Sequence, residues 1–130
     1  MDERVGTAPA RFRLNGEAVE ARAPAGERLS AALRERLGAR DVKVGCNAGD
    51  CGACTVLVDG APVCACLMPV HQAAGAHVET LSGLLASCEH ARALTAAFEA
   101  WGAVQCGICT PGMLVSATAL LRETPRPTRA

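Results

Sequence analysis

The stretch VKVGCNAGDCGACTV, residues 42–56, places three cysteines within nine positions. Cys46 and Cys51 are separated by four residues, and Cys51 and Cys54 by two. A loop that wraps a bulky group needs glycines, because glycine permits sharp turns and lets backbone N–H groups approach the bound group. The glycines between or beside these cysteines are Gly45, Gly49 and Gly52. The stretch therefore predicts a loop built around a metal cluster.

The spacing of these cysteines is the plant-type ferredoxin pattern for a 2Fe-2S cluster, in which a fourth cysteine lies further along the chain. The alternative is a structural zinc site with four cysteine ligands. Zinc sites usually present two short hooks of two cysteines each, whereas this loop concentrates three cysteines and leaves the fourth distant. The spacing favours iron–sulfur over zinc, and a disulfide scaffold is the least favoured interpretation.

The fourth ligand is either Cys64 or Cys66. If the Asp-Gly pair at 59–60 forms a two-residue turn, Cys66 lies opposite Ala53 and Cys64 lies opposite Thr55. Both cysteine side chains then point to the same face, because side chains alternate along a strand. Position decides instead: Cys66 reaches the ligand loop itself. We assign Cys66 as the fourth ligand and interpret Cys64 as a small buried apolar residue.

Composition and charge exclude several classes of function. Thirteen basic residues balance thirteen acidic ones, which leaves no electrostatic footprint for nucleic acid or an anionic membrane. The N-terminus has neither the apolar core of a signal peptide nor a twin arginine, and no segment is long and apolar enough to span a bilayer. We expect a cytoplasmic protein, whose eight cysteines stay reduced and serve more often as metal ligands than as disulfides.

The first part of the chain is predicted to form a small sheet crossed by a helix. Asn-Gly at 15–16 indicates a hairpin with strands at 12–14 and 17–21, and Asp-Gly at 59–60 indicates a second hairpin. An amphipathic helix with Leu29, Leu33 and Leu37 on its apolar face ends at Gly38, and residues 77–81 form a last strand. This order fits an α+β fold with a β-grasp, ferredoxin-like domain over residues 1–83.

The second part of the chain has the periodicity of helices. Apolar residues recur three or four apart from Leu84 to Trp101, which predicts a helix over this run, with Cys88 in its core stripe. A second helix is predicted with Thr110 as its N-cap and Pro111 as its first residue. Residues 84–130 are therefore expected to form a helical domain that amounts to an incomplete bundle.

Cys106 and Cys109 form a second motif, two residues apart, before the last predicted helix. Alone, such a pair could be half of a zinc site, a redox-active dithiol at a helix N-terminus, or a coincidence. His71, His77 and His90 share no ligand spacing, so they are expected to be solvated or locally hydrogen-bonded. No cysteine, histidine or carboxylate forms a recognisable catalytic cluster.

Together, the two motifs resemble those of the iron–sulfur subunit, or N-terminal iron–sulfur region, of the molybdenum hydroxylases. This family includes xanthine dehydrogenase, aldehyde oxidoreductase and carbon monoxide dehydrogenase. The residues that carry the resemblance are GCNAGDCGACTVLVDGAPVCAC at 45–66 and GAVQCGICTPGMLVSATALL at 102–121. The resemblance implies a β-grasp domain with one 2Fe-2S cluster and a helical domain with another. It also implies electron transfer from molybdopterin in a large subunit toward an FAD-binding subunit or another acceptor.

The resemblance implies a role for particular residues. The ferredoxin-type cluster would be ligated by Cys46, Cys51, Cys54 and Cys66. Cys106 and Cys109 would supply half of the ligands of the second cluster. Gln105 matches a family glutamine beside the pterin, so it is expected to contact the molybdopterin of the large partner; without the resemblance, a helix-end polar residue is an equally good interpretation.

The chain departs from the family pattern after the second motif. Family members continue into further helix and a Cys-x-Cys pair that completes the second cluster, and no such pair follows the second motif in this sequence. Because a 2Fe-2S cluster needs four protein ligands, we expect about two irons per isolated chain. Either the subunit is shortened at its C-terminus or a partner supplies the missing thiolates.

The sequence thus predicts a non-catalytic electron-transfer subunit of a molybdenum-containing oxidoreductase. One alternative is a free-standing ferredoxin-like module whose shortened helical domain only docks a partner. A zinc-stabilised interaction domain is a third possibility.

Overall fold

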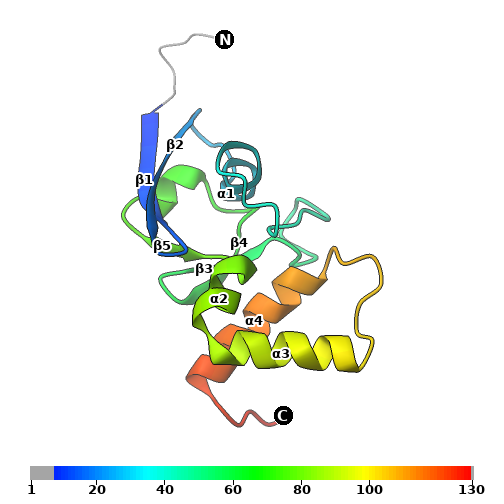
Figure 1. The fold of residues 1–130 in the computed structure, drawn as a ribbon. Helices are drawn as coiled ribbons and strands as arrows, with labels where there is room; N and C mark the ends of the chain where they lie inside the picture. Colours follow the sequence, from blue (N-terminus) through cyan, green and yellow to red (C-terminus); the bar gives the residue numbers. More distant parts are fainter. Residues whose placement is uncertain (1–7, 130) are drawn as a thin grey trace.

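A computed structural model of the chain describes residues 8–129. It contains a five-stranded sheet, a helical segment against the sheet, and three helices gathered away from the N-terminus (Figure 1). Along the chain the elements are β1 (Ala8–Leu14), β2 (Glu17–Ala23), α1 (Leu29–Ala31), the π-helical turn η1 (Ala32–Arg36), β3 (Thr55–Val58), β4 (Ala61–Cys64), the 3-10 helix η2 (Val70–Ala73), β5 (His77–Glu79), α2 (Leu81–Ser87), α3 (Glu89–Ala100) and α4 (Thr110–Glu123). No helix among these residues is long and apolar enough to cross a membrane.

Both predicted hairpins are confirmed, and each turn has the backbone that its sequence requires. Asn15 and Gly16 have φ values of 51° and 87°, and Asp59 and Gly60 have φ values of 49° and 83°. Two successive positive φ angles are typical of a type I′ turn, whose twist matches that of the strands it joins. The first hairpin is longer than predicted, because its pairing extends to Ala8 opposite Ala23.

Strand β5 joins the two hairpins into one sheet. The strand order is β2-β1-β5-β3-β4, with β5 parallel to β1 and antiparallel to β3. The hairpins β1–β2 and β3–β4 are antiparallel. Because β5 lies in the middle, two units that are far apart in sequence share a single hydrogen-bonded sheet, as expected for the predicted α+β arrangement.

The helical segment against the sheet forms the main core. Leu29 and Leu33, both fully buried, pack with the inward side chains of the sheet, including Val56. The segment is only partly α-helical, since its second half is a π-helix with the Leu37 N–H bonded to Ala32 O at 3.1 Å. It ends as predicted at Gly38, whose φ of 71° is the left-handed conformation that glycine adopts without strain.

The single helix predicted from Leu84 to Trp101 is wrong, because the chain forms two helices that meet at Cys88. This residue is extended, with φ −126° and ψ 120°, and it ends α2 and precedes α3. The break leaves the apolar spacing intact, so periodicity could not reveal it. It redirects the chain so that α2 contacts β5 while α3 packs along α4. Leu84, Cys88 and Ala91 enter a second core with Leu57 of β3 and Val115 of α4.

Helix α4 lies against both α3 and β3. Its N-cap is Cys109, so the prediction of Thr110 was wrong by one residue. Pro111 still lies in the first turn, where a missing N–H costs no helical hydrogen bond. Trp101, predicted on the core stripe, is 87% exposed at the end of α3.

Candidate metal centre

The first cysteine loop, residues 45–54, is an irregular segment that leads into β3. Asn47, Gly49 and Gly52 all have positive φ, between 55° and 76°, so the loop turns sharply three times. At Gly45 the requirement is space instead, since a Cβ there would lie 2.8 Å from Cys51 Sγ. The glycines thus bring the backbone close to the sulfurs, as the sequence predicted.

Backbone N–H groups of this loop point at two of its sulfurs. Cys46 Sγ accepts hydrogen bonds from the N–H groups of Ala48, Asp50 and Cys51, at 3.3, 3.2 and 3.2 Å. Cys51 Sγ accepts from the N–H groups of Cys46 and Ala53, at 3.3 and 3.4 Å. The N–H groups of Cys51, Ala48 and Asp50 lower the pKa of the Cys46 thiol to about 7. Such donors favour the thiolate, which is the form that binds metal.

Cys54 and Cys66 lie on the inner side of this site, and each is only 3% exposed. The Cys66 N–H donates to Cys54 Sγ at 3.4 Å. Burial raises the pKa of the Cys54 thiol to about 11, despite that hydrogen bond. A thiol in such surroundings loses its proton when a cation takes the proton's place. Cys46 is therefore prepared to ionise, and the buried pair excludes water from the inner side.

The choice between Cys64 and Cys66 depends on their positions along the second hairpin, whose predicted register is confirmed at Cys64. Cys64 pairs with Thr55 across the second hairpin. Cys64 is half-buried and packs against the main core. Beyond the strand, the Ala65 N–H bonds to Cys54 O at 3.4 Å, which keeps Cys66 next to the ligand loop.

The residues assigned to the site, Cys46, Cys51, Cys54 and Cys66, all offer sulfur, the donor that iron–sulfur clusters use. Among residues 8–129, no three His, Cys, Asp or Glu side chains converge closely enough to hold one metal ion. Structural zinc needs four donors around one point, about 2.3 Å from each sulfur. A 2Fe-2S cluster spreads its four thiolates over two irons, so it does not need all four sulfurs around one point.

The second motif lies on the α3–α4 connection, residues 101–109. Cys106 and Cys109 are both exposed, and so is Gln105. The connection turns at Gly107, which has a φ of 87°. In the described part of the chain, the fold brings no third thiol, histidine or carboxylate to this pair in a metal-binding arrangement.

Cys88 is buried apart from both motifs, as its interpretation as a core residue predicted. Burial by itself would raise the pKa of its thiol, but the Ala91 N–H, the Arg122 guanidinium and the His90 N–H lower it overall. Arg122 also pairs with Glu79 of β5 at 3.2 Å. The end of α4 is thereby tied to the sheet.

The two motifs meet at a contact that sequence reasoning missed. Gly112, in the first turn of α4, faces the backbone of the first cysteine loop so closely that a Cβ would overlap Gly52 O. The same Cβ would lie 3.0 Å from Ala53 O. Helix α4, whose N-cap is Cys109, therefore touches the peptide segment between Cys51 and Cys54.

Comparison with known proteins identifies the family. Residues 12–74 match the 2Fe-2S iron–sulfur cluster binding domain, and residues 80–130 match a second family described as a 2Fe-2S binding domain. The chain is 45% identical over 115 residues to the nicotinate dehydrogenase small FeS subunit of Eubacterium barkeri. The matched residues cover 88% of this chain and 73% of that protein. The chain is an iron–sulfur subunit of the molybdenum hydroxylase family.

Other members of the molybdenum hydroxylase family are similar in sequence and in fold. The xanthine dehydrogenase iron–sulfur-binding subunit of Escherichia coli O157:H7 is 43% identical over 115 residues, covering 86% of this chain and 71% of that protein. The crystal structure of quinoline 2-oxidoreductase from Pseudomonas putida 86 superposes with a TM-score of 0.86 at 39% identity, over 94% of this chain and 75% of that chain. The crystal structure of the aldehyde oxidoreductase from Desulfovibrio desulfuricans superposes with a TM-score of 0.83 at 42% identity. The match covers 93% of this chain and 13% of that chain.

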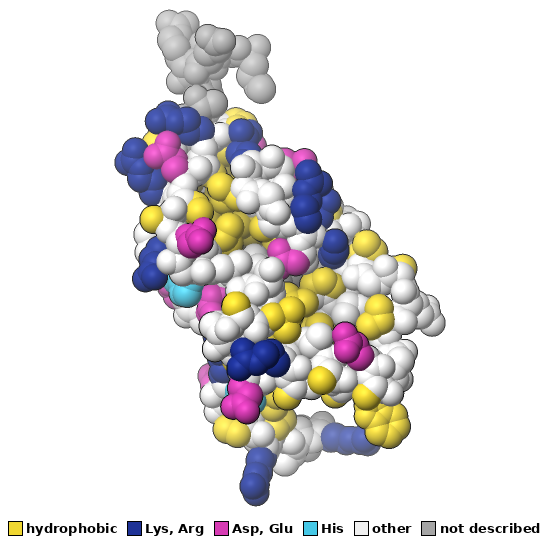
Figure 2. Space-filling model, viewed as in Figure 1, with side chains coloured by type: hydrophobic (Ala, Val, Ile, Leu, Met, Phe, Trp, Pro, Cys, Tyr) yellow, Lys and Arg dark blue, Asp and Glu magenta, His cyan; other side chains and the backbone are white. Residues whose placement is uncertain are grey.

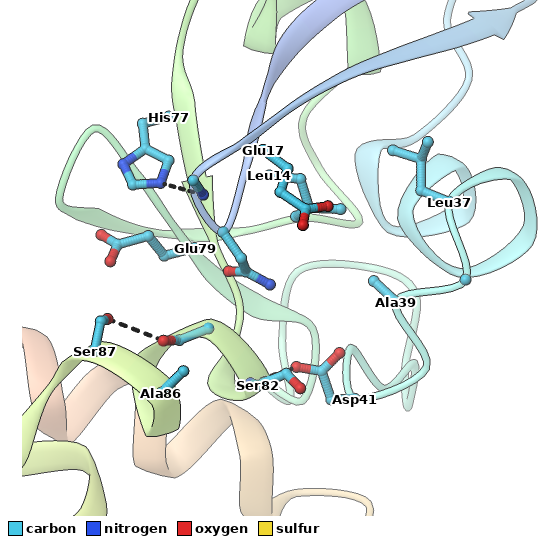
Figure 3. Close-up of a pocket in the computed structure, with 14 residues that line it drawn as sticks. Leu14, Glu17, Leu37, Ala39, Asp41, His77, Glu79, Ser82, Ala86 and Ser87 are labelled. Carbon is cyan, nitrogen blue, oxygen red and sulfur yellow. Dashed lines mark hydrogen bonds between the residues drawn. The ribbon is translucent and has the colours of Figure 1, made fainter.

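The pocket shown in Figure 3 lies apart from the cysteines of this molybdenum hydroxylase subunit. It has a volume of about 540 Å³ and lies between the first hairpin turn, the segment after η1, and α2. Its polar groups serve the fold: Asp41 Oδ2 accepts from the Ser82 N–H at 2.8 Å, and His77 Nε2 accepts from the Gly16 N–H at 3.1 Å. The local hydrogen bonding expected for a histidine is thus confirmed at His77.

Proposed function

We propose that this chain transfers electrons within a molybdopterin-dependent hydroxylase or dehydrogenase and performs no substrate chemistry itself. The proposal depends on one observation, the convergence of loop N–H groups on the sulfurs of Cys46 and Cys51. When bound, a 2Fe-2S cluster accepts and releases one electron at a time. Electrons would pass from the molybdopterin of a large subunit toward FAD, in a further subunit, or another acceptor.

Four cysteines are assigned to hold the ferredoxin-type cluster: Cys46, Cys51, Cys54 and Cys66. The N–H groups that point at the first two sulfurs would favour the extra negative charge that the site carries after it gains an electron. The buried pair limits access of water from the inner side. The chain thus orients and shields the site without an acid, base or nucleophile for a substrate.

The second motif is assigned to the contact with the large, molybdopterin-binding subunit. Gln105 would contact the pterin there, and Cys106 and Cys109 would supply half of a second ligand set. Exposed apolar side chains flank the motif, which is typical of a surface that another chain covers. These residues are Trp101, Val104, Ile108 and Met113. Figure 2 shows hydrophobic side chains exposed among the helices at this end of the molecule. The assembly is proposed to be cytoplasmic.

Iron analysis of the anaerobically purified chain tests this proposal. We expect about two irons and two acid-labile sulfides per chain, and a single 2Fe-2S species in the EPR spectrum after dithionite reduction. A Cys106→Ser/Cys109→Ser variant serves as the matched control and should retain the same iron. Zinc without iron would overturn the function, and two EPR species of equal spin count would overturn the incomplete second site.

A further inference from the structure

Arg28 connects the two halves of the proposed ligand set. Its Nη1 donates to Asn47 O at 2.6 Å, to Asn47 Oδ1 at 3.3 Å and to Cys66 O at 2.9 Å. Asn47 follows Cys46 directly, and its φ of 55° places it in a left-handed turn. One nitrogen atom therefore joins the outer turn of the first cysteine loop to the backbone of the distant fourth cysteine.

The backbone on either side of Arg28 is fixed against the same distant segment. Glu27 O accepts from the Val70 N–H at 2.8 Å, the Leu29 N–H donates to Met68 O at 2.7 Å, and Arg28 itself forms a β-bridge with Pro69. Leu29, the next residue, is fully buried. The side chain of Arg28 thus extends toward Asn47 from a backbone that is held in place on both sides.

We propose that Arg28 is a positioning residue for the cluster, and that its positive charge favours the reduced state. This inference rests on the proposed function. Two of its acceptors are backbone carbonyls of residues beside or at ligand positions, so its loss would remove a direct link between the Cys46 turn and the Cys66 segment. An arginine suits this role because its guanidinium stays charged and its donors point in fixed directions.

The effect of the charge follows from the change in charge on reduction. One-electron reduction of a four-thiolate 2Fe-2S site adds one negative charge, and a nearby cation stabilises the state with more negative charge. The Arg28 guanidinium contacts the chain at both Asn47 and Cys66, so it lies on the edge of the site. Removing its charge should therefore lower the reduction potential. Raising the salt concentration should diminish the difference, because this residue is exposed.

The test compares the full chain with Arg28→Gln, Arg28→Lys and, as the control, Arg22→Gln. Arg22 lies on the edge strand β2, pairs with Glu20 at 3.1 Å, and carries the same charge. The readouts are the midpoint potential from a spectroscopic titration and the rate of iron loss to a chelator. We expect Arg28→Gln to reduce the ratio of reduced to oxidised cluster by about threefold at a fixed potential. We also expect it to lose iron several times faster.

Arg28→Lys separates the charge from the bridging contacts. It should keep a potential near that of the unmodified chain but lose iron faster, because a lysine ammonium lacks the planar fork of donors. If Arg28→Gln binds no cluster, Arg28→Lys decides the matter: an unchanged rate of iron loss overturns the positioning role. Arg28→Gln values equal to those of Arg22→Gln overturn the whole inference. Absence of a cluster in the unmodified chain refutes the proposed function instead.

Discussion

In the first cysteine loop, backbone N–H groups point at the sulfurs of Cys46 and Cys51, whereas Cys106 and Cys109 lie exposed on the α3–α4 connection. The first site draws on a strand register, a set of left-handed turns and a buried inner pair of cysteines. The second has a turn and two thiols. The difference teaches that the described fold arranges backbone donors around the first group of sulfurs and leaves the second pair open to its surroundings.

The largest effect is expected from a pair of substitutions in the first site. Cys66→Ser should remove or greatly destabilise the cluster, because it removes a thiolate from the buried half. Cys64→Ala should leave the iron content unchanged, since Cys64 packs against the core in β4. Iron and sulfide analysis of both variants checks this. Equal iron loss in the two, or loss only with Cys64→Ala, would contradict the assignment of the fourth ligand.

A smaller effect should follow from a substitution at the contact between α4 and the first cysteine loop. Gly112→Ala places a methyl group against Gly52 O, so the helix and the loop must move apart. Overpacking of this kind costs about 1–3 kcal/mol of the free energy of unfolding. Thermal unfolding of the cluster-loaded chain measures it. Ser116→Ala, at an exposed position of the same helix, is the control and should change stability little. A Gly112→Ala variant as stable as the control would show that the contact is loose.

The smallest effect concerns ionisation of the metal-free chain. The N–H groups around Cys46 hold the pKa of its thiol at about 7, below its ordinary value of 9.0. The unfolded chain therefore binds the proton more tightly between these pH values, so this group adds stability as pH rises from 7 to 9 and loses it as pH falls through 7. Alkylation of Cys46, followed by mass spectrometry, should show a midpoint near pH 7. A midpoint near pH 9 would indicate that the N–H groups do not prepare this site.

Cys54 should titrate in the opposite sense. Burial raises the pKa of its thiol to about 11, so the folded chain keeps the proton that the unfolded chain loses above pH 9. The stability contribution of this group is present at lower pH and is lost as pH rises from 9 to 11. Alkylation of Cys54 should therefore be slow between pH 7 and 9, where Cys46 reacts readily, and equal rates for the two thiols in this range would contradict the prediction.

Local chemistry made much of the fold predictable. The two turns at 15–16 and 59–60 need successive positive φ angles, and their Asn-Gly and Asp-Gly pairs encode that need directly. Gly38 ended its helix for a similar reason. The break at Cys88 could not be predicted, because apolar residues continue to recur three or four apart on both sides of this extended residue. The division of the chain at 83/84 stays a prediction.

The candidate site was predictable only where its parts are close in sequence. Spacing pointed to Cys46, Cys51 and Cys54, and hairpin register correctly placed Cys64 opposite Thr55. The Cys66 N–H donates to Cys54 Sγ at 3.4 Å, and its role as the fourth ligand stays a prediction. The contacts of Arg28 with Asn47 and Cys66 span 19 and 38 residues, and the contact of Gly112 with Gly52 depends on how α4 packs. Such contacts are set by tertiary packing, which leaves no periodic trace in the sequence.

The central place of β5 in the sheet has a consequence for how the chain is made on the ribosome. Synthesis from the N-terminus delivers both hairpins and the thiols of Cys46 through Cys66 before residues 77–79 exist. Until that strand emerges, no strand pairing links β1 to β3, because each pairs with β5 and not with the other. The four thiols that would bind iron are thus present in a nascent chain whose sheet is still in two pieces.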